Sequence, residues 1–295
     1  MRSGFVSLIG RPNTGKSTLL NTIINEKVAI VSDKAGTTRN VIQGIYNEVE
    51  TQVVFVDTPG IGKPDNKLGK MLNREAIALT KDVDVILFVV DIASGFGRGD
   101  AKILRMLENE TMPVILVLNK IDRLKNDEIL KAITEVKDLY PFAEIVPLSA
   151  MKNDNVDRLI SCIKKYLTDN IRYFGEEEFT SQTSSFMASE LVREKLLNKT
   201  EEEVPHSLTC YTTMFENKKD IINISVDVIV DRDSLKKIII GKRGEKLKSV
   251  GIEARADLER LFDKKVYLET YVKTVKNWKD KERYLKELGF DGFNE

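Results

Sequence analysis

The sequence predicts a doubly wound α/β domain followed by a smaller α+β domain. Three observations carry this prediction. Short apolar runs alternate with helical patterns in the first part of the chain, the pattern changes after an acidic stretch, and each part has a glycine-rich turn ahead of a helix. A chain of 295 residues is long enough for two cores. We expect domains at 1–170 and 181–295, joined by a linker at 171–180.

The first part contains continuous apolar runs rich in Val, Ile and Phe. They lie at residues 5–9, 53–56, 85–90, 114–118 and 144–147. Such runs suit strands that are buried on both faces of a sheet. Segments with helical periodicity lie between most of them, and a last helix ends near Leu167. The exception is residues 28–50, which we expect to form a long loop followed by a strand. This alternation is typical of a parallel, doubly wound sheet.

The second part predicts the order helix, strand, strand, helix, helix, strand, helix. The elements with expected bounds are a helix at 181–198, two strands joined near 217–220, a helix with an apolar face from Leu247 to Leu261, a strand at 264–275 and an amphipathic helix at 276–288. The first of the two consecutive helices has no expected bounds, and the apolar run 238–240 ahead of Gly241 looks strand-like. Apolar residues alternate with a period of two in the segment of the two predicted strands, and they recur at steps of three and four residues from Leu247 to Leu261.

Composition excludes several classes of site. The chain has 46 basic and 46 acidic residues, but residues 232–286 hold 17 basic against 9 acidic ones, a pattern of nucleic-acid surfaces and equally of solvated faces. Cys162 and Cys210 have no metal-ligand spacing, and the single His206 excludes histidine-rich metal sites. No apolar run approaches the ~20 residues that span a bilayer. We therefore expect a cytoplasmic protein with reduced thiols.

The first glycine-rich turn, GRPNTGKS, fits the phosphate-loop pattern G-x-x-x-x-G-K-[ST] between a predicted strand and a predicted helix. Its backbone N–H groups can surround the β-phosphate, Lys16 can reach the β- and γ-phosphates, and the Ser17 hydroxyl can bind Mg²⁺. The nucleotide-binding residues expected here are Gly10, Asn13, Thr14, Gly15, Lys16, Ser17 and Thr18.

The segment DTPG follows a second predicted strand and places Asp57 at the strand's carboxyl end, where parallel sheets bind ligands. We expect Asp57 to hold Mg²⁺ through a water and the N–H of Gly60 to sense the γ-phosphate.

The segments NKID and SAMK follow two further strands. The carboxylate of Asp122 can accept two hydrogen bonds from guanine at an edge that adenine does not offer, which selects GTP over ATP. The full set of base-site residues expected from these segments is Asn119, Lys120, Asp122, Ser149 and Ala150. Chance rarely supplies four such motifs in order at successive strand ends.

The four motifs resemble those of translation-factor-related GTPases, and KAGTTRN at 34–40 resembles their switch segment. By that resemblance Thr38, or else Thr37, supplies a second hydroxyl to Mg²⁺ when the γ-phosphate is present. The implied metal ligands are thus Ser17, Thr38 and Asp57. Loss of the γ-phosphate would release the segment.

The residue after Gly60 is Ile61, where Ras-like GTPases carry a glutamine that orients water. Related GTPases with this substitution use a phosphate-loop asparagine, here Asn13, to bind K⁺ beside the phosphates. The resemblance implies slow turnover that K⁺ stimulates more than Na⁺. The catalytic residues we expect are Asn13, Lys16, Thr38 and Gly60.

The second glycine-rich turn, IIIGKRGEKLKSVG, contains G-x-x-G from Gly241 to Gly244. The KH module uses such a loop to clamp the backbone of about four nucleotides. Lys242 and Arg243 can meet phosphates, and Lys246 and Lys248 extend the positive surface. The order of elements resembles the type II KH fold. The turn is too short to wrap a triphosphate and lacks a Ser or Thr after its Lys, so we expect it to hold RNA.

A P-loop GTPase domain followed by a type II KH domain resembles the bacterial Era GTPase family, and segments such as TTRNVIQGI, SELVREKL and EEEVPHSL extend the resemblance over nearly the whole chain. It implies GTP or GDP with Mg²⁺ and K⁺ as cofactors. It also implies binding to the 3′ end of small-subunit rRNA and a nucleotide-controlled switch in 30S assembly. We expect a monomer with no DNA partner, and some members of the family associate peripherally with the inner face of the membrane.

Two alternatives stay open. A tRNA-modification GTPase is suggested by GTTRN and Asn13, but that family adds domains and a C-terminal cysteine motif that this chain lacks. The second alternative is a passive RNA-binding protein whose nucleotide site does not hydrolyse GTP. The complete phosphate, Mg²⁺ and guanine motifs count against it.

Overall fold

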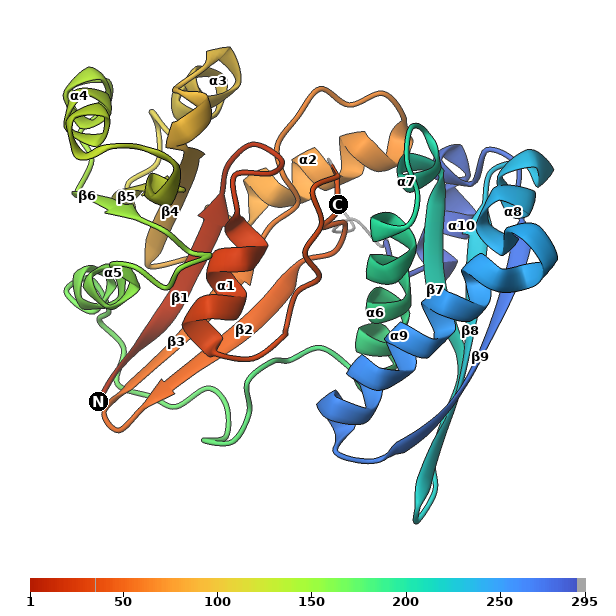
Figure 1. Cartoon of the computed structure of the whole chain (residues 1–295). Coiled ribbons are helices and arrows are strands. Elements are labelled where there is room, and N and C mark those ends of the chain that lie inside the picture. Colours follow the sequence, from red (N-terminus) through yellow and green to blue (C-terminus); the bar gives the residue numbers. More distant parts are fainter. Residues whose placement is uncertain (35, 291–295) are drawn as a thin grey trace.

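The computed structural model describes residues 1–34 and 36–290 and has two domains, each built on its own sheet (Figure 1). Ala35 of the KAGTTRN segment and the last five residues of the expected second domain lie outside the described residues. The expected fold class, a doubly wound α/β domain followed by a smaller α+β domain, is confirmed.

The first domain holds a six-stranded sheet in the order β2-β3-β1-β4-β5-β6. Only β2 runs antiparallel to its neighbour β3, and the other strand pairs are parallel. The elements are β1 (Arg2–Ile9), α1 (Lys16–Ile24), β2 (Ile42–Glu48), β3 (Thr51–Asp57), α2 (Lys67–Ala78), β4 (Val85–Asp91), α3 (Arg98–Met106), β5 (Val114–Asn119), α4 (Asn126–Val136), β6 (Glu144–Leu148) and α5 (Val156–Ile163).

Helices cover both faces of this sheet, which explains the continuous apolar runs in the sequence. One core packs α1 and α5 against the sheet, and a second core packs α2, α3 and α4 against the opposite face. Every residue of β3, β4 and β5 is buried. Burial on both faces removes any reason for polar residues to alternate along these strands. The carboxyl ends of β1, β3 and β5 therefore meet at one edge, where the three loops that follow them can form a common site.

The second domain has a three-stranded sheet in the order β7-β8-β9, with β7 antiparallel and β9 parallel to β8. Its elements are α6 (Ser184–Asn198), α7 (Val204–Ser207), β7 (Leu208–Asn217), β8 (Ile221–Val230), α8 (Asp233–Ile240), α9 (Glu245–Phe262), β9 (Lys265–Thr274) and α10 (Glu282–Glu287). Helices α6, α8 and α9 pack on one face of the sheet (Figure 1).

Two expected elements differ from the structure. The apolar run 238–240, expected to be strand-like, forms the last turn of helix α8, because Leu235 and Ile239 lie four residues apart on a buried helical face. The expected terminal helix 276–288 is a short 3₁₀ turn (Trp278–Asp280) followed by α10. Asn277 adopts a left-handed conformation and Lys281 is extended, which interrupts a continuous helix.

Residues 171–180 run along the edge of the first sheet. Gln52 of β3 accepts hydrogen bonds from the N–H groups of Tyr173 and Phe174, and Asn47 of β2 donates to three main-chain carbonyls between Gly175 and Glu178. The expected linker is therefore held against the first domain over much of its length.

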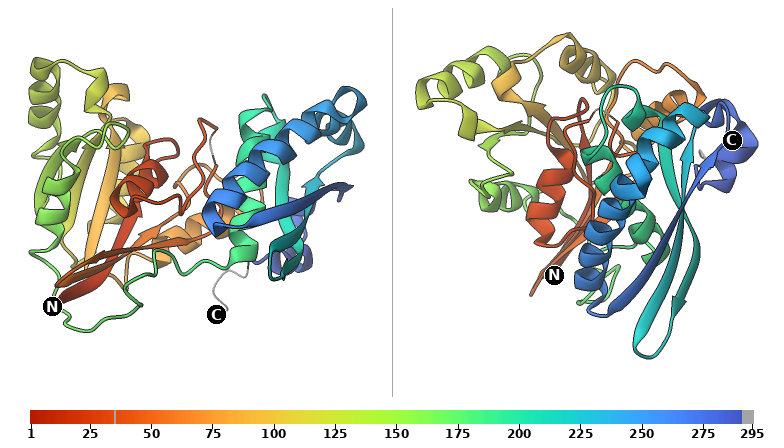
Figure 2. Two further views of the ribbon diagram at one scale, coloured as in Figure 1. Left: turned by 60° about the horizontal axis from the view of Figure 1, so that its bottom comes forward. Right: turned by 45° about the vertical axis from the view of Figure 1, so that its right-hand side comes forward.

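The segment between α1 and β2, residues 25–41, lies between the two domains in the views of Figures 1 and 2. Ile30 of this segment belongs to the hydrophobic core of the second domain. A further apolar cluster joins Leu68 of α2 to Trp278 and Leu285. The two domains thus share packed surfaces beside the loops that follow β1 and β3. None of the helices described for residues 1–34 and 36–290 combines the length and the apolarity needed to cross a bilayer.

Candidate functional site

The turn from Gly10 to Ser17 connects β1 to α1 and directs its backbone toward one cavity. Gly15 caps the helix with a φ of 94°, and a Cβ at this position would meet Asn119 Nδ2 at 2.3 Å. Only glycine therefore fits between the turn and β5. The N-terminus of α1 offers unpaired N–H groups at the cavity, which is a favourable environment for phosphate.

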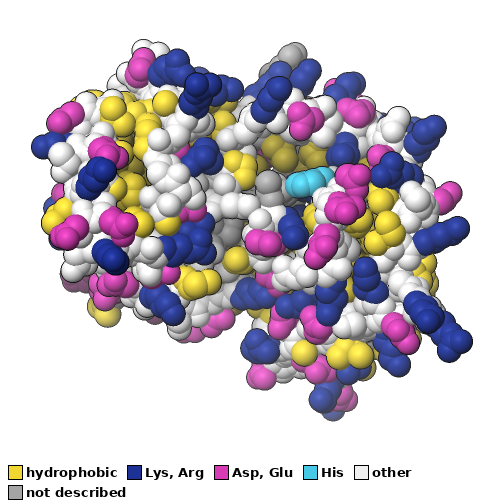
Figure 3. Space-filling model, turned by 45° about the horizontal axis from the view of Figure 1, so that its top comes forward, with side chains coloured by type: hydrophobic (Ala, Val, Ile, Leu, Met, Phe, Trp, Pro, Cys, Tyr) yellow, Lys and Arg dark blue, Asp and Glu magenta, His cyan; other side chains and the backbone are white. Residues whose placement is uncertain are grey.

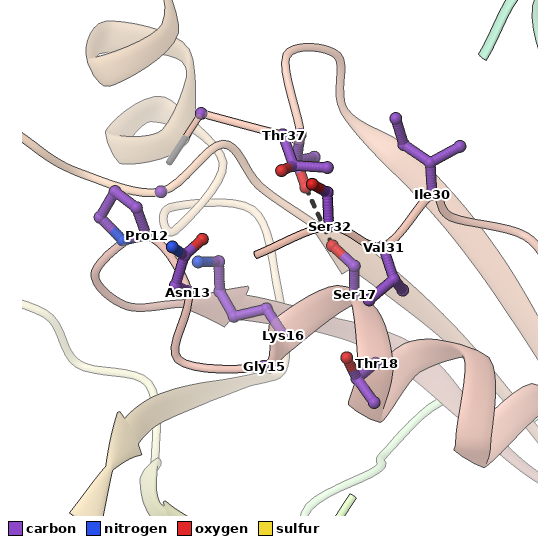
Figure 4. Close-up of a pocket in the computed structure, with 13 residues that line it drawn as sticks. Pro12, Asn13, Gly15, Lys16, Ser17, Thr18, Ile30, Val31, Ser32 and Thr37 are labelled. Atoms are coloured by element: carbon purple, nitrogen blue, oxygen red, sulfur yellow. Dashed lines mark hydrogen bonds between the residues drawn. The ribbon is translucent and has the colours of Figure 1, made fainter. Parts of the chain in front are cut away.

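The cavity is lined by the turn, by residues 30–32 and 36–38 of the interdomain segment, and by Gly60. Figure 4 shows the side chains of Asn13, Lys16 and Ser17 directed into it. Lys16 is buried, and its Nζ donates to the carbonyls of Gly10 (3.3 Å) and Arg11 (3.0 Å). Burial lowers the pKa of Lys16, while the nearby Asp57 carboxylate opposes that shift.

Three side chains from distant parts of the chain meet at the base of this cavity. Ser17 Oγ donates to Asp57 Oδ2 at 2.6 Å and lies 2.9 Å from Thr38 Oγ1, a bond drawn in Figure 4. Burial raises the pKa of Asp57 to about 6, although Lys16 and the hydrogen bond from Ser17 oppose the shift. These are the three residues expected to bind Mg²⁺. The alternative hydroxyl, that of Thr37, instead donates to the Lys34 carbonyl at 2.6 Å.

The donor set fits a hard divalent cation. Asp57 is fully buried, and its Oδ1 has no hydrogen-bond partner among the described residues. A buried carboxylate oxygen without a partner is costly unless a cation or a water satisfies it. Two hydroxyls and one carboxylate leave several positions for phosphate oxygens and water, as Mg²⁺ requires. Within the described ranges, no three His, Cys, Asp or Glu side chains gather as a metal cluster.

Gly60 and Ile61 lie against the phosphate-loop turn. Gly60 packs on Pro12, and the N–H of Ile61 donates to the Gly10 carbonyl at 3.2 Å. Ile61 is 7% exposed and belongs to the core beside α2. An aliphatic, buried side chain cannot orient a water molecule.

Asn13 is exposed at the tip of the turn, where it adopts a φ of 64°, and its Nδ2 donates to the Asp33 carbonyl at 2.7 Å. The amide group therefore connects the phosphate loop to the segment that carries Thr38.

Asn119 and Lys120 brace the turn from the side of β5. Asn119 Nδ2 donates to the Thr14 carbonyl at 2.8 Å, and Lys120 Nζ donates to the Asn13 carbonyl at 2.7 Å. Lys120 also forms an ion pair of 2.6 Å with Asp91, at the end of β4. Burial alone would raise the pKa of Asp91, but Lys120 and the hydrogen bonds from Ser94 together outweigh it and lower that pKa. Asp91 was missed from the sequence, although a carboxylate at the end of a buried strand is a signal that could have found it.

Asp122 and Ala150 lie next to Asn119 and Lys120. Asp122 is exposed, and its Oδ1 accepts a hydrogen bond from Ser149 Oγ at 2.5 Å. The N–H of Ala150 donates to Asn119 Oδ1 at 3.0 Å. The segments NKID and SAMK, 27 residues apart between Asp122 and Ser149, are thus brought together as expected. The carboxylate is held at the surface with its second oxygen open to a ligand.

The second domain contacts the segment that carries Thr38, and sequence reasoning missed these contacts. Arg193 of α6 donates to the Thr37 carbonyl at 2.5 Å. Arg39 donates to the carbonyls of Pro205 (3.1 Å) and Leu208 (2.5 Å). Main-chain acceptors carry no sequence signature, so no local pattern could have identified these contacts.

The G-x-x-G turn joins α8 to α9 at the surface of the second domain. Gly241 has a φ of 73°, and a Cβ there would meet Lys246 Cβ at 2.7 Å, so the position requires glycine. Lys242, Arg243 and Lys248 are exposed, while Lys246 is half-buried against the turn. Gly244, also at positive φ, caps helix α9.

The expected nucleotide-binding residues lie in the first domain, and the expected RNA-binding residues lie at the turn between α8 and α9 of the second domain, so the two sets are separate. The space-filling view shows Lys and Arg side chains along the outer edge of the second domain, on the right in Figure 3. The single His206 lies at the hollow between the domains, with acidic side chains beside it in this view, and the charges of Arg39, Lys279 and Lys34 also act on it (Figure 3).

Comparisons with known proteins agree with this division. A family model described as a 50S ribosome-binding GTPase matches residues 5–120, and a KH-domain model matches residues 203–279. A crystal structure of an Era point variant from Aquifex aeolicus bound to GDP and AlF₄⁻ is 39% identical, with a TM-score of 0.95 over 98% of this chain and 99% of that chain. The same values apply to a crystal structure of Era in complex with MgGDPNP and nucleotides 1506–1542 of 16S ribosomal RNA.

Proposed function

The chain belongs to the Era family of GTPases, and on this basis we propose that it is a GTP hydrolase that binds single-stranded ribosomal RNA during assembly of the small ribosomal subunit. The observation that carries the proposal is that residues suited to phosphate, Mg²⁺ and guanine gather in one domain while the other carries a G-x-x-G turn. A related Era in complex with MgGDPNP and the 16S rRNA fragment supports the RNA class.

We assign the residues of the nucleotide site as follows. The turn from Gly10 to Thr18 holds the phosphates through its N–H groups, and Lys16 exchanges its carbonyl partners for the β- and γ-phosphates. Asp122 and the backbone of Ser149 and Ala150 hold guanine, while Asn119 and Lys120 brace the turn.

Ser17, Thr38 and Asp57 are the protein groups that would hold Mg²⁺. When bound, Mg²⁺ supplies positive charge against the phosphate oxygens. Gly60 packs on Pro12 and lines the same cavity, and we assign its N–H to the γ-phosphate.

Turnover is slow in this proposal because Ile61 cannot position water. Asn13 is the group we assign to K⁺, because its amide lies beside both the turn and the Asp33 carbonyl. A monovalent cation held there can offset charge that develops between the β- and γ-phosphates, as an arginine finger does.

RNA binding is assigned to Gly241, Lys242, Arg243, Gly244, Lys246 and Lys248. Lys and Arg at this turn neutralise phosphates, and the two glycines allow the RNA backbone to come close. The domain boundaries 1–170 and 181–295, a monomeric state and peripheral membrane contact stay predictions, which limited proteolysis, sedimentation and membrane flotation test.

Crosslinking of the purified GTP-bound protein to total cellular RNA, followed by sequencing of the fragments, tests the proposal. We expect fragments from the 3′ end of small-subunit rRNA. Fragments that come mainly from tRNA would instead favour a tRNA-modification GTPase. GTP binding without any hydrolysis, in K⁺ and Mg²⁺, would favour the passive RNA-binding alternative.

A further inference from the structure

The position of Thr38 depends on contacts from outside its own domain. Thr38 lies in the segment 25–41, whose described residues, 25–34 and 36–41, form no helix or strand. The start of this segment is held by Asn21 of α1, which bonds to the main chain of Val28 and Ala29. Nearer Thr38, the first domain holds it through Asn13, which donates to the Asp33 carbonyl, and through the bond between Thr38 and Ser17. A loop with few internal hydrogen bonds has many accessible conformations, so additional anchors decide where its side chains lie.

The second domain supplies anchors on both sides of Thr38. The preceding carbonyl, that of Thr37, accepts from Arg193 Nη2 of α6. The following side chain, Arg39, donates to the carbonyls of Pro205 in α7 and Leu208 at the start of β7, and lies over the Trp278 ring at 5.7 Å. A residue fixed at both of its neighbours has little remaining backbone freedom.

Arg193 is itself rigidly held. Its side chain is 1% exposed, and Glu190, one turn earlier in α6, accepts from Nε at 2.7 Å and from Nη2 at 2.6 Å. Two parallel bonds to one carboxylate fix the plane of a guanidinium group. Its Nη1 is buried with no hydrogen-bond partner among the described residues. Apolar side chains of similar volume often pack in such places at lower cost, so this buried ion pair is poorly explained by stability alone.

The earlier part of the segment is held by the same helix. Glu194, the next residue of α6, accepts from the N–H of Val31 at 3.0 Å and pairs with Lys27 at 2.5 Å, and Ile30 is buried in the core of the second domain. Helix α6 in turn packs on α9, the helix that follows the G-x-x-G turn. A continuous set of contacts therefore joins the RNA-binding turn to the residue before Thr38.

We propose that Arg193 is a positioning residue for the GTPase reaction, supplied by the RNA-binding domain, which holds the Thr37 carbonyl so that the Thr38 hydroxyl faces Ser17 and Asp57. This inference rests on the proposed function. It adds that the metal site is complete only while α6 is docked on the interdomain segment. Since coupling between binding sites is reciprocal, the nucleotide that engages Thr38 also favours the docked arrangement of α6.

The test compares the affinities of R193M for GDPNP and for GDP, both with Mg²⁺, with those of the unaltered protein. Thr38 is expected to act only with a γ-phosphate, so R193M should weaken GDPNP binding about tenfold, the range of one hydrogen bond to a charged group, and leave GDP binding within about twofold. The hydrolysis rate should fall with the GDPNP affinity. R193K keeps the charge but has a single donor group, so it should recover part of the loss.

K199M is the matched control, because Lys199 caps the same helix and pairs with Glu253 of the second domain at 2.7 Å, and no hydrogen bond or ion pair joins its side chain to the described residues of segment 25–41. We expect K199M to leave the ratio of GDPNP affinity to GDP affinity unchanged.

Equal losses of affinity for GDPNP and GDP in R193M, or no loss of either, would overturn the inference, because a general structural role would not discriminate between the nucleotides. If R193M does not fold, R39K weakens the other anchor and should lower the affinity for GDPNP relative to the affinity for GDP. An unchanged relative affinity in R39K would then overturn the inference. An unaltered protein that hydrolyses no GTP would contradict the proposed function instead, and the ratio of affinities would still decide the inference.

Discussion

Ser17 Oγ of helix α1 lies 2.6 Å from Asp57 Oδ2 at the end of β3, and the second oxygen of that carboxylate is buried without a hydrogen-bond partner among the described residues. The two residues are 40 positions apart in the chain and meet only because β1 and β3 are parallel neighbours. Burial raises the pKa of Asp57 to about 6, so this carboxyl holds its proton more tightly than an exposed aspartate does.

The first prediction concerns pH. Because Mg²⁺ requires the ionised carboxylate, protons compete with the cation, and the Mg²⁺ affinity of the GDP-bound protein should fall below about pH 6, approaching tenfold per pH unit. Mg²⁺ titrations between about pH 5 and pH 8 measure this.

Nucleotide phosphates also bind protons in this range, so D57N provides the reference profile. The difference between the two profiles isolates the carboxyl of Asp57. S17A should weaken Mg²⁺ binding and move its loss to higher pH, because the hydrogen bond from Ser17 lowers the pKa of Asp57. Superimposable profiles for D57N and the unaltered protein would contradict the assignment.

The second prediction concerns the base. In D122N an amide replaces the carboxylate that accepts from guanine, and its NH₂ group can instead donate to the 2-carbonyl of xanthine. Two hydrogen bonds to a charged group are each worth about 1.5–3 kcal/mol, so GTP binding should weaken by about 10²-fold or more while binding of xanthosine triphosphate improves. Competition binding with the two triphosphates measures the change. Unaltered preference for GTP would show that guanine is read elsewhere.

The third prediction concerns the monovalent cation. Hydrolysis should be faster in K⁺ than in Na⁺ at equal ionic strength, and N13A should remove the difference, since Asn13 is the side chain assigned to the cation. Asn13 also donates to the Asp33 carbonyl, so N13D, which keeps an oxygen but loses that donor, separates the two roles. Equal rates in both salts for the unaltered protein would contradict the assignment.

The fourth prediction separates the two phosphate-binding turns. Replacement of Lys242 and Arg243 by Asp should abolish binding to a single-stranded RNA of the small-subunit 3′ end and leave GTP affinity intact, because the two turns lie in different domains. The matched control reverses the charge of two exposed lysines of the first domain, Lys131 on α4 and Lys137 directly after that helix. It makes the same change in net charge and should preserve RNA binding. Loss of GTP binding together with RNA binding would show that the chain is divided wrongly.

Much of this account could be predicted from local sequence. The buried strands, the glycine-rich turns and the residues Lys16, Ser17, Asp57 and Asp122 carry signals within a few positions, because strand burial and turn geometry restrict residue type locally. The prediction of a strand-like run before Gly241 was wrong. Ile238, Ile239 and Ile240 have high strand propensity, but the packing of Leu235 and Ile239 on one buried face makes the run helical.

The contacts between the domains could not be predicted in the same way. In the sequence, Arg193 is one of several charged residues in a predicted helix, and no local pattern distinguishes it. Its partners in the structure are a glutamate one turn away and a carbonyl 156 residues distant. Contacts to main-chain atoms place no demand on the residue type of the acceptor, so only the docked domains reveal them. Asp91 is an intermediate case, since its place at the end of β4 was visible but its partner Lys120 was not.

The most direct test of the account is the affinity for a single-stranded RNA of the small-subunit 3′ end, measured at one salt concentration with GDP and with GDPNP. The sites proposed for the nucleotide and the RNA lie in separate domains, both of which contact the segment 25–41, so a switch requires the two bindings to be coupled. The account predicts tighter RNA binding with GDPNP than with GDP, and a smaller difference in R193M. Identical RNA affinities with the two nucleotides would contradict it.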